Sequence, residues 1–113
     1  MYLKRPPIVS KHLRNAAKGE QCTVGVVGVC LSPDTATTVL AHLADGFGGM
    51  GKKAGEDITA VFACDACHAA IDGRTRCPEF VNHKFEYLFR ALCRTVIRQV
   101  ELHNVTIKGY VIE

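Results

Sequence analysis

The chain has 113 residues, six cysteines and a formal net charge of +3. This length is that of one domain, so we expect a single domain over residues 1–113. No apolar run approaches the roughly 20 residues that a membrane-spanning helix needs, and the first residues do not form a secretory signal pattern. We therefore expect a cytoplasmic protein without a membrane segment, whose cysteines indicate metal or redox chemistry rather than disulfide bonds.

The distribution of charge says more than its sum. Residues 1–18 carry five basic residues and no acidic one, residues 19–73 sum to −5, and residues 74–98 sum to +4. Two basic flanks around an acidic, cysteine-containing centre suit a nucleic-acid binder whose middle holds cations. The alternative is an ordinary solvated surface, which the charge pattern alone favours.

The first part of the chain predicts a short helix followed by a turn between two cysteines. Ser10 is a suitable N-cap for a helix that runs to Lys18, and Gly19 is a suitable stop. The glycine-containing stretch from Cys22 to Cys30 predicts a β-turn or hairpin that brings the two thiols together.

Two strands are predicted in the middle of the chain, separated by a glycine-rich loop. Residues 37–43 are rich in β-branched side chains and place His42 near the strand end. Residues 45–57 contain five glycines and predict a loop. The apolar run 58–63 predicts the second strand, which leads directly into Cys64.

The second half predicts two helices and a closing strand. One helix is expected over residues 65–72, ended by Gly73, and a long one over about 78–103, with Pro78 in its first turn. Residues 105–112 predict the strand. The apolar positions expected to face the core from the long helix are Val81, Phe85, Leu88, Phe89, Leu92, Val96 and Val100.

Three arginines follow one another at four-residue steps on the long helix. Arg90, Arg94 and Arg98 form a basic stripe, which is either a solvated face or a set of phosphate contacts. The solvated face is the favoured interpretation.

The strongest motif is a C-x2-C pair followed at once by a histidine. Two cysteine pairs can form a closed tetrahedral Zn²⁺ site, because thiolate sulfur suits this ion and four ligands exclude water. A redox C-x2-C motif and unconnected buried thiols are the alternatives. Cys77 and Cys93 have no paired spacing and are expected to be small core residues. The predicted structural zinc ligands are Cys22, Cys30, Cys64 and Cys67.

The histidine of this motif is a ligand that the zinc does not need. His68 and Asp72 are four residues apart, so on a helix they project from the same face and form a half-site for Mg²⁺, Mn²⁺ or another divalent ion. With His42, they predict a metal-dependent phosphodiesterase. Taken singly, His68 can instead be a capping or supporting residue and Asp72 a solvated one.

The motifs together resemble a known family. The segment from Val39 to Asp72 resembles an HNH, or ββα-metal, nuclease. The motifs Leu13-Arg-Asn-Ala-Ala-Lys-Gly19, Cys-x7-Cys, Leu-Ala-His42, Ala-Cys-x2-Cys-His and Ile-Asp72-x-Arg74-Thr75 resemble the YbcO-like family of small prophage nucleases. The resemblance covers roughly residues 13–76, with a similar terminal helix after them.

The resemblance implies an α+β fold, a small zinc-stabilised treble-clef or ββα-metal domain with a core of about residues 10–76 and flanking helices. It implies that His42 is the general base and that His68 and Asp72 ligate the catalytic divalent ion of a DNA endonuclease. Two positions depart from the pattern. Ala41 stands where many HNH enzymes have a metal-binding aspartate, and Thr59 lies near their middle asparagine, with Asp57 as a substitute.

DNA is the expected partner, gripped through its phosphates, and the sequence does not set the oligomeric state. A treble-clef zinc module that binds nucleic acid or protein without cutting it is the main alternative, and a structural phage-derived adaptor is a third. The expected phosphate contacts are Arg14, Lys52, Lys53, Arg74 and Arg76.

Overall fold

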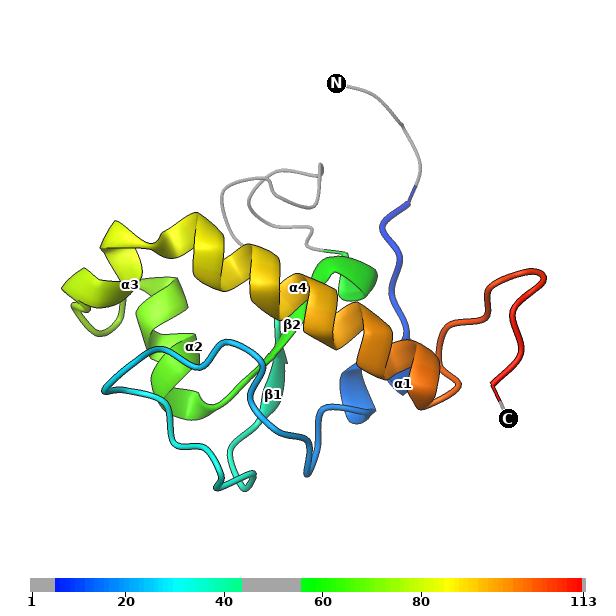
Figure 1. The fold of residues 1–113 in the computed structure, drawn as a ribbon, viewed down its shortest axis with the longest axis horizontal. Helices are drawn as coiled ribbons and strands as arrows, with labels where there is room; N and C mark the ends of the chain where they lie inside the picture. Colours follow the sequence, from blue (N-terminus) through cyan, green and yellow to red (C-terminus); the bar gives the residue numbers. More distant parts are fainter. Residues whose placement is uncertain (1–5, 44–55, 113) are drawn as a thin grey trace.

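The computed structural model describes residues 6–43 and 56–112. This part of the chain is a small α+β structure with a two-stranded sheet, which confirms the expected class (Figure 1). In chain order the elements are α1 (Lys11–Asn15), β1 (Val39–Ala41), the 3-10 helix η1 (Asp57–Thr59), β2 (Val61–Ala63), α2 (Asp65–Asp72), α3 (Pro78–Asn82) and α4 (Lys84–Glu101).

The two strands are antiparallel and three residues long. Val39 lies opposite Ala63, and Ala41 lies opposite Val61. His42 directly follows β1, whereas Cys64 directly follows β2, so these two residues extend from opposite ends of the sheet. We call these ends of the sheet the histidine end, where the predicted general base lies, and the cysteine end, where the predicted zinc ligand Cys64 lies.

Helix α4 packs across β2 and supplies the core with its inner face (Figure 1). The side chains of β2 are fully buried, with Phe62 the largest of them. Along the outer edge of β2, the Phe62 amide donates to Thr95 Oγ1 at 3.2 Å, and Thr23 Oγ1 donates to the Phe62 carbonyl at 2.9 Å. Because Thr95 is buried, α4 satisfies a strand edge that would otherwise need a third strand.

Several local predictions are confirmed. Ser10 caps α1, with its Oγ accepting a hydrogen bond from the Leu13 amide at 3.2 Å. Helix α2 covers the expected residues 65–72, and Gly73 ends it in the left-handed region at φ 78°. The capping serine and the terminating glycine are predictable because each acts within one turn of its own helix.

The prediction of one long helix over residues 78–103 is wrong. The chain leaves helical geometry at His83, whose φ and ψ are −129° and 29°, so that α3 and α4 are separate helices. The predicted inward face is wrong in part as well: Val81, Phe85 and Phe89 are 67–70% exposed. The buried side of α4 instead carries Tyr87, Leu88, Ala91, Thr95 and Gln99.

Residues 22–30 form turns, which is the first of the two predicted alternatives. Other boundaries differ: α1 ends at Asn15 rather than at Lys18, and the segment 105–112 has no strand. The strand expected over 37–43 is limited to β1, and the one expected over 58–63 begins with η1. The predicted loop 45–57 lies outside the described residues up to residue 55. Within the described ranges, no helix is long and apolar enough to cross a membrane.

We expect Thr95→Val to lower the free energy of unfolding by about 1–3 kcal/mol, because it leaves the buried Phe62 amide without its acceptor. Urea unfolding followed by circular dichroism measures this. Thr106→Val, at an exposed site, is the matched control and should change stability by less than about 0.5 kcal/mol. Equal stabilities of the two variants would contradict this role of Thr95.

Candidate functional site

Four cysteines form one cluster at the cysteine end of the sheet. Their sulfur atoms all lie within 4.8 Å of one another, and the Cys64 and Cys30 sulfurs are 4.0 Å apart. Cys64 and Cys67 are fully buried, whereas Cys22 and Cys30 are partly buried. The predicted pairs therefore do meet, although they are 34 residues or more apart along the chain.

Local backbone geometry explains how each pair is presented. Gly25 and Gly28 have φ values of 63° and 79°, which a side chain would strain. The Val26 carbonyl then accepts a hydrogen bond from the Cys30 amide at 2.9 Å, and the chain turns back on itself. In the other pair, Cys64 is the N-cap of α2, so Cys67 lies one turn further along the helix.

The donor set fits Zn²⁺. Zinc–sulfur bonds of about 2.3 Å at tetrahedral angles place ligand sulfurs about 3.8 Å apart, close to the separation of Cys64 and Cys30. The Leu31 amide lies 3.4 Å from the Cys64 sulfur and the Ser32 amide 3.5 Å from the Cys30 sulfur, so both donate to sulfur. Hydrogen bonding from Cys67 lowers the pKa of Cys22 to about 4. Cys22 is thus held as thiolate, the form that binds metal, whereas the hydrogen bond to Cys22 raises the pKa of Cys67 and burial raises that of Cys30.

At the histidine end, His42 is held by a buried carboxylate. Its Nε2 lies 2.6 Å from Asp57 Oδ1, and the Asp57 side chain has no exposed surface. Asp57 Oδ2 accepts from the Ser10 amide at 2.7 Å and from Arg14 Nε at 2.9 Å. Burial opposes ionisation of Asp57, but the hydrogen bonds from His42, Ser10 and Arg14 outweigh it and lower its pKa.

The ionised carboxylate determines which histidine nitrogen carries the proton. A carboxylate can only accept hydrogen bonds, so His42 Nε2 must donate. In the neutral ring, Nδ1 is then the nitrogen with a free lone pair. The His42 side chain is 36% exposed, so this ring is accessible to water.

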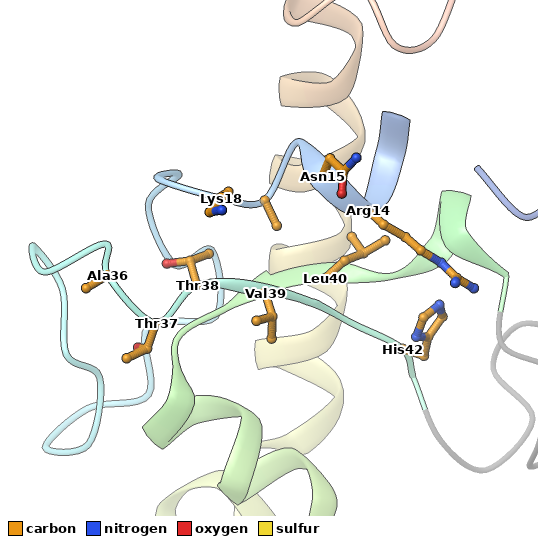
Figure 2. Close-up of a pocket in the computed structure, with 10 residues that line it drawn as sticks. Arg14, Asn15, Lys18, Ala36, Thr37, Thr38, Val39, Leu40 and His42 are labelled. Carbon is orange, nitrogen blue, oxygen red and sulfur yellow. The ribbon is translucent and has the colours of Figure 1, made fainter. Parts of the chain in front are cut away.

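His42 lines an open pocket of about 570 Å³ together with α1 (Figure 2). In Figure 2 the Arg14 side chain extends toward His42. Lys18 also lines this pocket, as do the hydroxyl residues Thr37 and Thr38. Among the residues that the structure describes, the lining contains no acidic residue, so the pocket suits an anion such as a phosphodiester.

The other predicted pair, His68 and Asp72, is formed on α2. His68 Nε2 lies 3.3 Å from Asp72 Oδ2, and both side chains are partly exposed. Among the described residues, the cysteine cluster is the one group of three or more possible metal ligands whose ligand atoms lie this close together. His42, His68 and Asp72 do not form such a group. Of the three predicted residues, His42 thus pairs with Asp57, and His68 pairs with Asp72.

The expected phosphate contacts lie in different surroundings. Arg14 borders the pocket, Arg74 pairs with Asp72 at 3.3 Å, and Arg76 is exposed. Lys52 and Lys53 lie outside the described residues.

The three arginines of the α4 stripe make contacts within the chain. Arg98 Nε binds Glu20 at 2.7 Å, and Arg90 stacks on the Tyr87 ring at 5.6 Å. Arg94 reaches the Thr23 carbonyl at 3.4 Å.

Asp57 is the site residue that sequence reasoning undervalued, since it entered only as a substitute for an asparagine. Its partners are 15 residues away at His42 and 43 residues away at Arg14, so no local periodicity reveals them. The available signal was the acid pair Glu56-Asp57 immediately before an apolar run, because a chain rarely buries charge without a partner.

Comparisons with known proteins agree with the motifs. The model of the family described as "Putative nuclease YbcO" matches residues 11–104. Proteins of this name from Escherichia coli K12 and Enterobacteria phage 82 are each 47% identical over 64 residues, or 56% of this chain. The match spans 65% of the length of each of these relatives.

A solved structure is similar as well. It is described as a putative bacteriophage protein from Escherichia coli K-12 and is 30% identical in sequence. The comparison covers 81% of this chain and 100% of that one, with a TM-score of 0.65.

We expect natively purified protein to contain one zinc per chain, measured by elemental analysis. Cys67→Ser should lose the metal and unfold, because metal binding to a closed cysteine site contributes directly to folding free energy. Cys93→Ser, at the exposed cysteine outside the cluster, is the matched control and should keep both metal and fold. Full stability of Cys67→Ser without metal would contradict the assignment.

Proposed function

The chain belongs to the YbcO family, and on this basis we propose that it is a metal-dependent DNA endonuclease whose catalytic base is His42. The observation that carries the proposal is the His42 ring, fixed by the buried Asp57 at the edge of a pocket that Arg14 and Lys18 also line. An oriented base beside a basic pocket is an arrangement that suits phosphodiester hydrolysis.

His42 would take the proton of the attacking water. An imidazole is the side chain best able to accept a proton near neutral pH. With Nε2 committed to Asp57, the proton would go to Nδ1, and the positive ring would then be stabilised by the carboxylate at 2.6 Å. Asp57 in this scheme orients the base and does not touch the substrate.

The phosphodiester would be bound by the cations of the pocket. Arg14 uses Nε for Asp57, which fixes the guanidinium at the pocket edge and leaves its terminal nitrogens for phosphate oxygens. Lys18 adds charge from the same segment. Such contacts carry no base information, so we expect binding to DNA to be largely indifferent to sequence.

His68 and Asp72 would hold the catalytic divalent ion. One imidazole and one carboxylate on the same face of α2 are suitable donors, and their partial exposure leaves room for water and phosphate ligands. A divalent ion bound there would stabilise negative charge on the phosphoryl and leaving oxygens.

The proposal includes an HNH-like, treble-clef core in which zinc on the cysteine cluster is structural. The element order supports it, because His42 directly follows β1, β2 leads into Cys64, and the second cysteine pair opens α2. We propose that residues 1–113 form this one nuclease domain.

A non-catalytic zinc module that binds nucleic acid or protein is the second candidate. Ala41 favours it, because it supplies no carboxylate beside the base. Among the described residues, His42, His68 and Asp72 also form no group of close metal ligands. The two candidates differ in whether these polar groups are needed for any measurable reaction.

We expect the protein to nick plasmid DNA with Mg²⁺ or Mn²⁺ and to stop in EDTA. His42→Ala should lower cleavage by about 10²–10⁴-fold, the usual contribution of a general base, with DNA binding and zinc content retained. His68→Ala should abolish cleavage and weaken binding of the second metal. His12→Ala, an exposed histidine on α1, is the matched control. If His42→Ala cuts as well as wild type, or if no divalent ion supports cleavage, the binding module is the better description.

We expect Asp57→Asn to reduce the rate of cleavage at nearly unchanged KM, because His42 would no longer be held with its proton on Nε2. In the wild type, His42, Arg14 and Ser10 donate to the two oxygens of Asp57. Asparagine has only one acceptor oxygen, so at least one donor would face its NH2 group, which cannot accept a hydrogen bond. Nitrogen-15 NMR of the imidazole should show His42 protonated at Nε2 in the wild type and a mixture in the variant. An unchanged tautomer in the variant would contradict the orienting role, whatever the activity.

A further inference from the structure

Helix α4 carries an apolar ridge that runs beside its stripe of arginines. The ridge consists of Phe85, Phe89, Cys93 and Ile97, at four-residue steps. The two phenylalanines are each 70% exposed and Ile97 is 61% exposed. Cys93 is the one exposed cysteine among the six, all of which the structure describes. Large aromatic side chains are costly to leave in water, and a contiguous row of them marks an interaction surface.

The two ends of the ridge are shaped differently. Near its N-terminal end, Phe85 and Phe89 are largely exposed. Near its C-terminal end, the segment that follows α4 lies beside the end of the helix (Figure 1). The two form an open apolar groove of about 470 Å³. The apolar residues lining this groove are Val96, Ile97, Val100, Ile107, Tyr110 and Ile112.

We propose that this surface binds a second copy of the chain, with the two α4 helices antiparallel about a two-fold axis between Phe89 and Cys93. Two-fold symmetry brings the projecting end of each helix to the grooved end of the other. Phe85 of each copy then lies against Ile97 of its partner, and Phe89 lies against the partner's Cys93. Rows at four-residue steps interdigitate readily between helices.

The charges beside the ridge suit the same pairing. Glu86 lies beside the N-terminal half of the ridge and Arg94 beside its C-terminal half, so an antiparallel arrangement brings Glu86 of each copy near Arg94 of the other. Arg90, which lies closest to the axis, is drawn onto the ring of Tyr87 in its own chain. A parallel arrangement would place like charges opposite one another.

The size of the surface is sufficient for a dimer. Two phenylalanines at 70% exposure, with Ile97 and the exposed Tyr110, present on the order of 500 Å² per copy. Covering this surface on both copies removes on the order of 1,000 Å², where specific interfaces begin. A nucleic acid is a poorer occupant, because the four residues of the ridge are uncharged and the neighbouring Arg90 and Arg94 already contact Tyr87 and Thr23 within the chain.

The test is the oligomeric state of the intact, zinc-containing chain. Sedimentation equilibrium from about 1 to 200 μM should show a monomer–dimer equilibrium in the wild type, with a dissociation constant in the micromolar range. Phe89→Glu should raise this constant at least tenfold. Val27→Asp, at a site with 71% exposure outside α4, is the matched control and should dimerise as the wild type does. Zinc content and the circular dichroism spectrum check that both variants are folded.

The cysteine on the ridge supplies the second measurement. A short bifunctional maleimide should link two wild-type chains through Cys93, and Cys93→Ser should abolish the link while leaving the dimer in place. A monomer at all concentrations would overturn the proposal. Dimerisation that survives Phe89→Glu unchanged, or cross-linking that survives Cys93→Ser, would do so as well. Because none of these measurements uses DNA or activity, their outcome is independent of the proposed nuclease function.

Discussion

The antiparallel pairing of β1 with β2 runs over three residue pairs, and the positions of the reactive side chains depend on it. Cys64 leaves one end of the sheet and His42 leaves the other, so the register fixes how the cysteine cluster and the base are related in space. Two such short strands are not stable alone. They persist because α4 covers β2 and because Thr95 and Thr23 complete the hydrogen bonds of its outer edge.

The two ends of the sheet are stabilised by different chemistry. At one end, four sulfur atoms within 4.8 Å of one another bring together two segments that share no regular secondary structure, which suits a metal staple in so small a chain. At the other end, Asp57 joins the N-terminal segment to His42 through charge-assisted hydrogen bonds. A buried carboxylate with three donors is stabilising only while all its partners remain in place. This requirement makes the geometry of His42 rigid.

The sequence predicts features whose cause is local and misses those whose cause is distant. Ser10, Gly73 and the C-x2-C motif act within one helical turn, and α1 and α2 begin or end where these residues indicate. The periodic row of apolar residues on α4 could not be assigned to a face, because the helix has two apolar sides and buries the one with Ala91 and Thr95 against β2. Likewise, nothing near His42 in the sequence shows that its partner is Asp57. The cysteine cluster was predictable because the sequence contains two cysteine pairs, one of them a C-x2-C motif, and four thiolates in two pairs are a typical zinc ligand set.

The shortness of the strands has a consequence for how such a chain can change in length. A side chain alternates between the two faces of a strand with every residue, so inserting or deleting one residue within β1 would turn His42 away from Asp57. The same change within β2 would move Cys64 off the cluster or unpair Phe62 from Thr95. With three residues per strand, no bulge has room to absorb the error. Length variation is therefore tolerable only in the connections, and the strand pair must be inherited as a unit of fixed size.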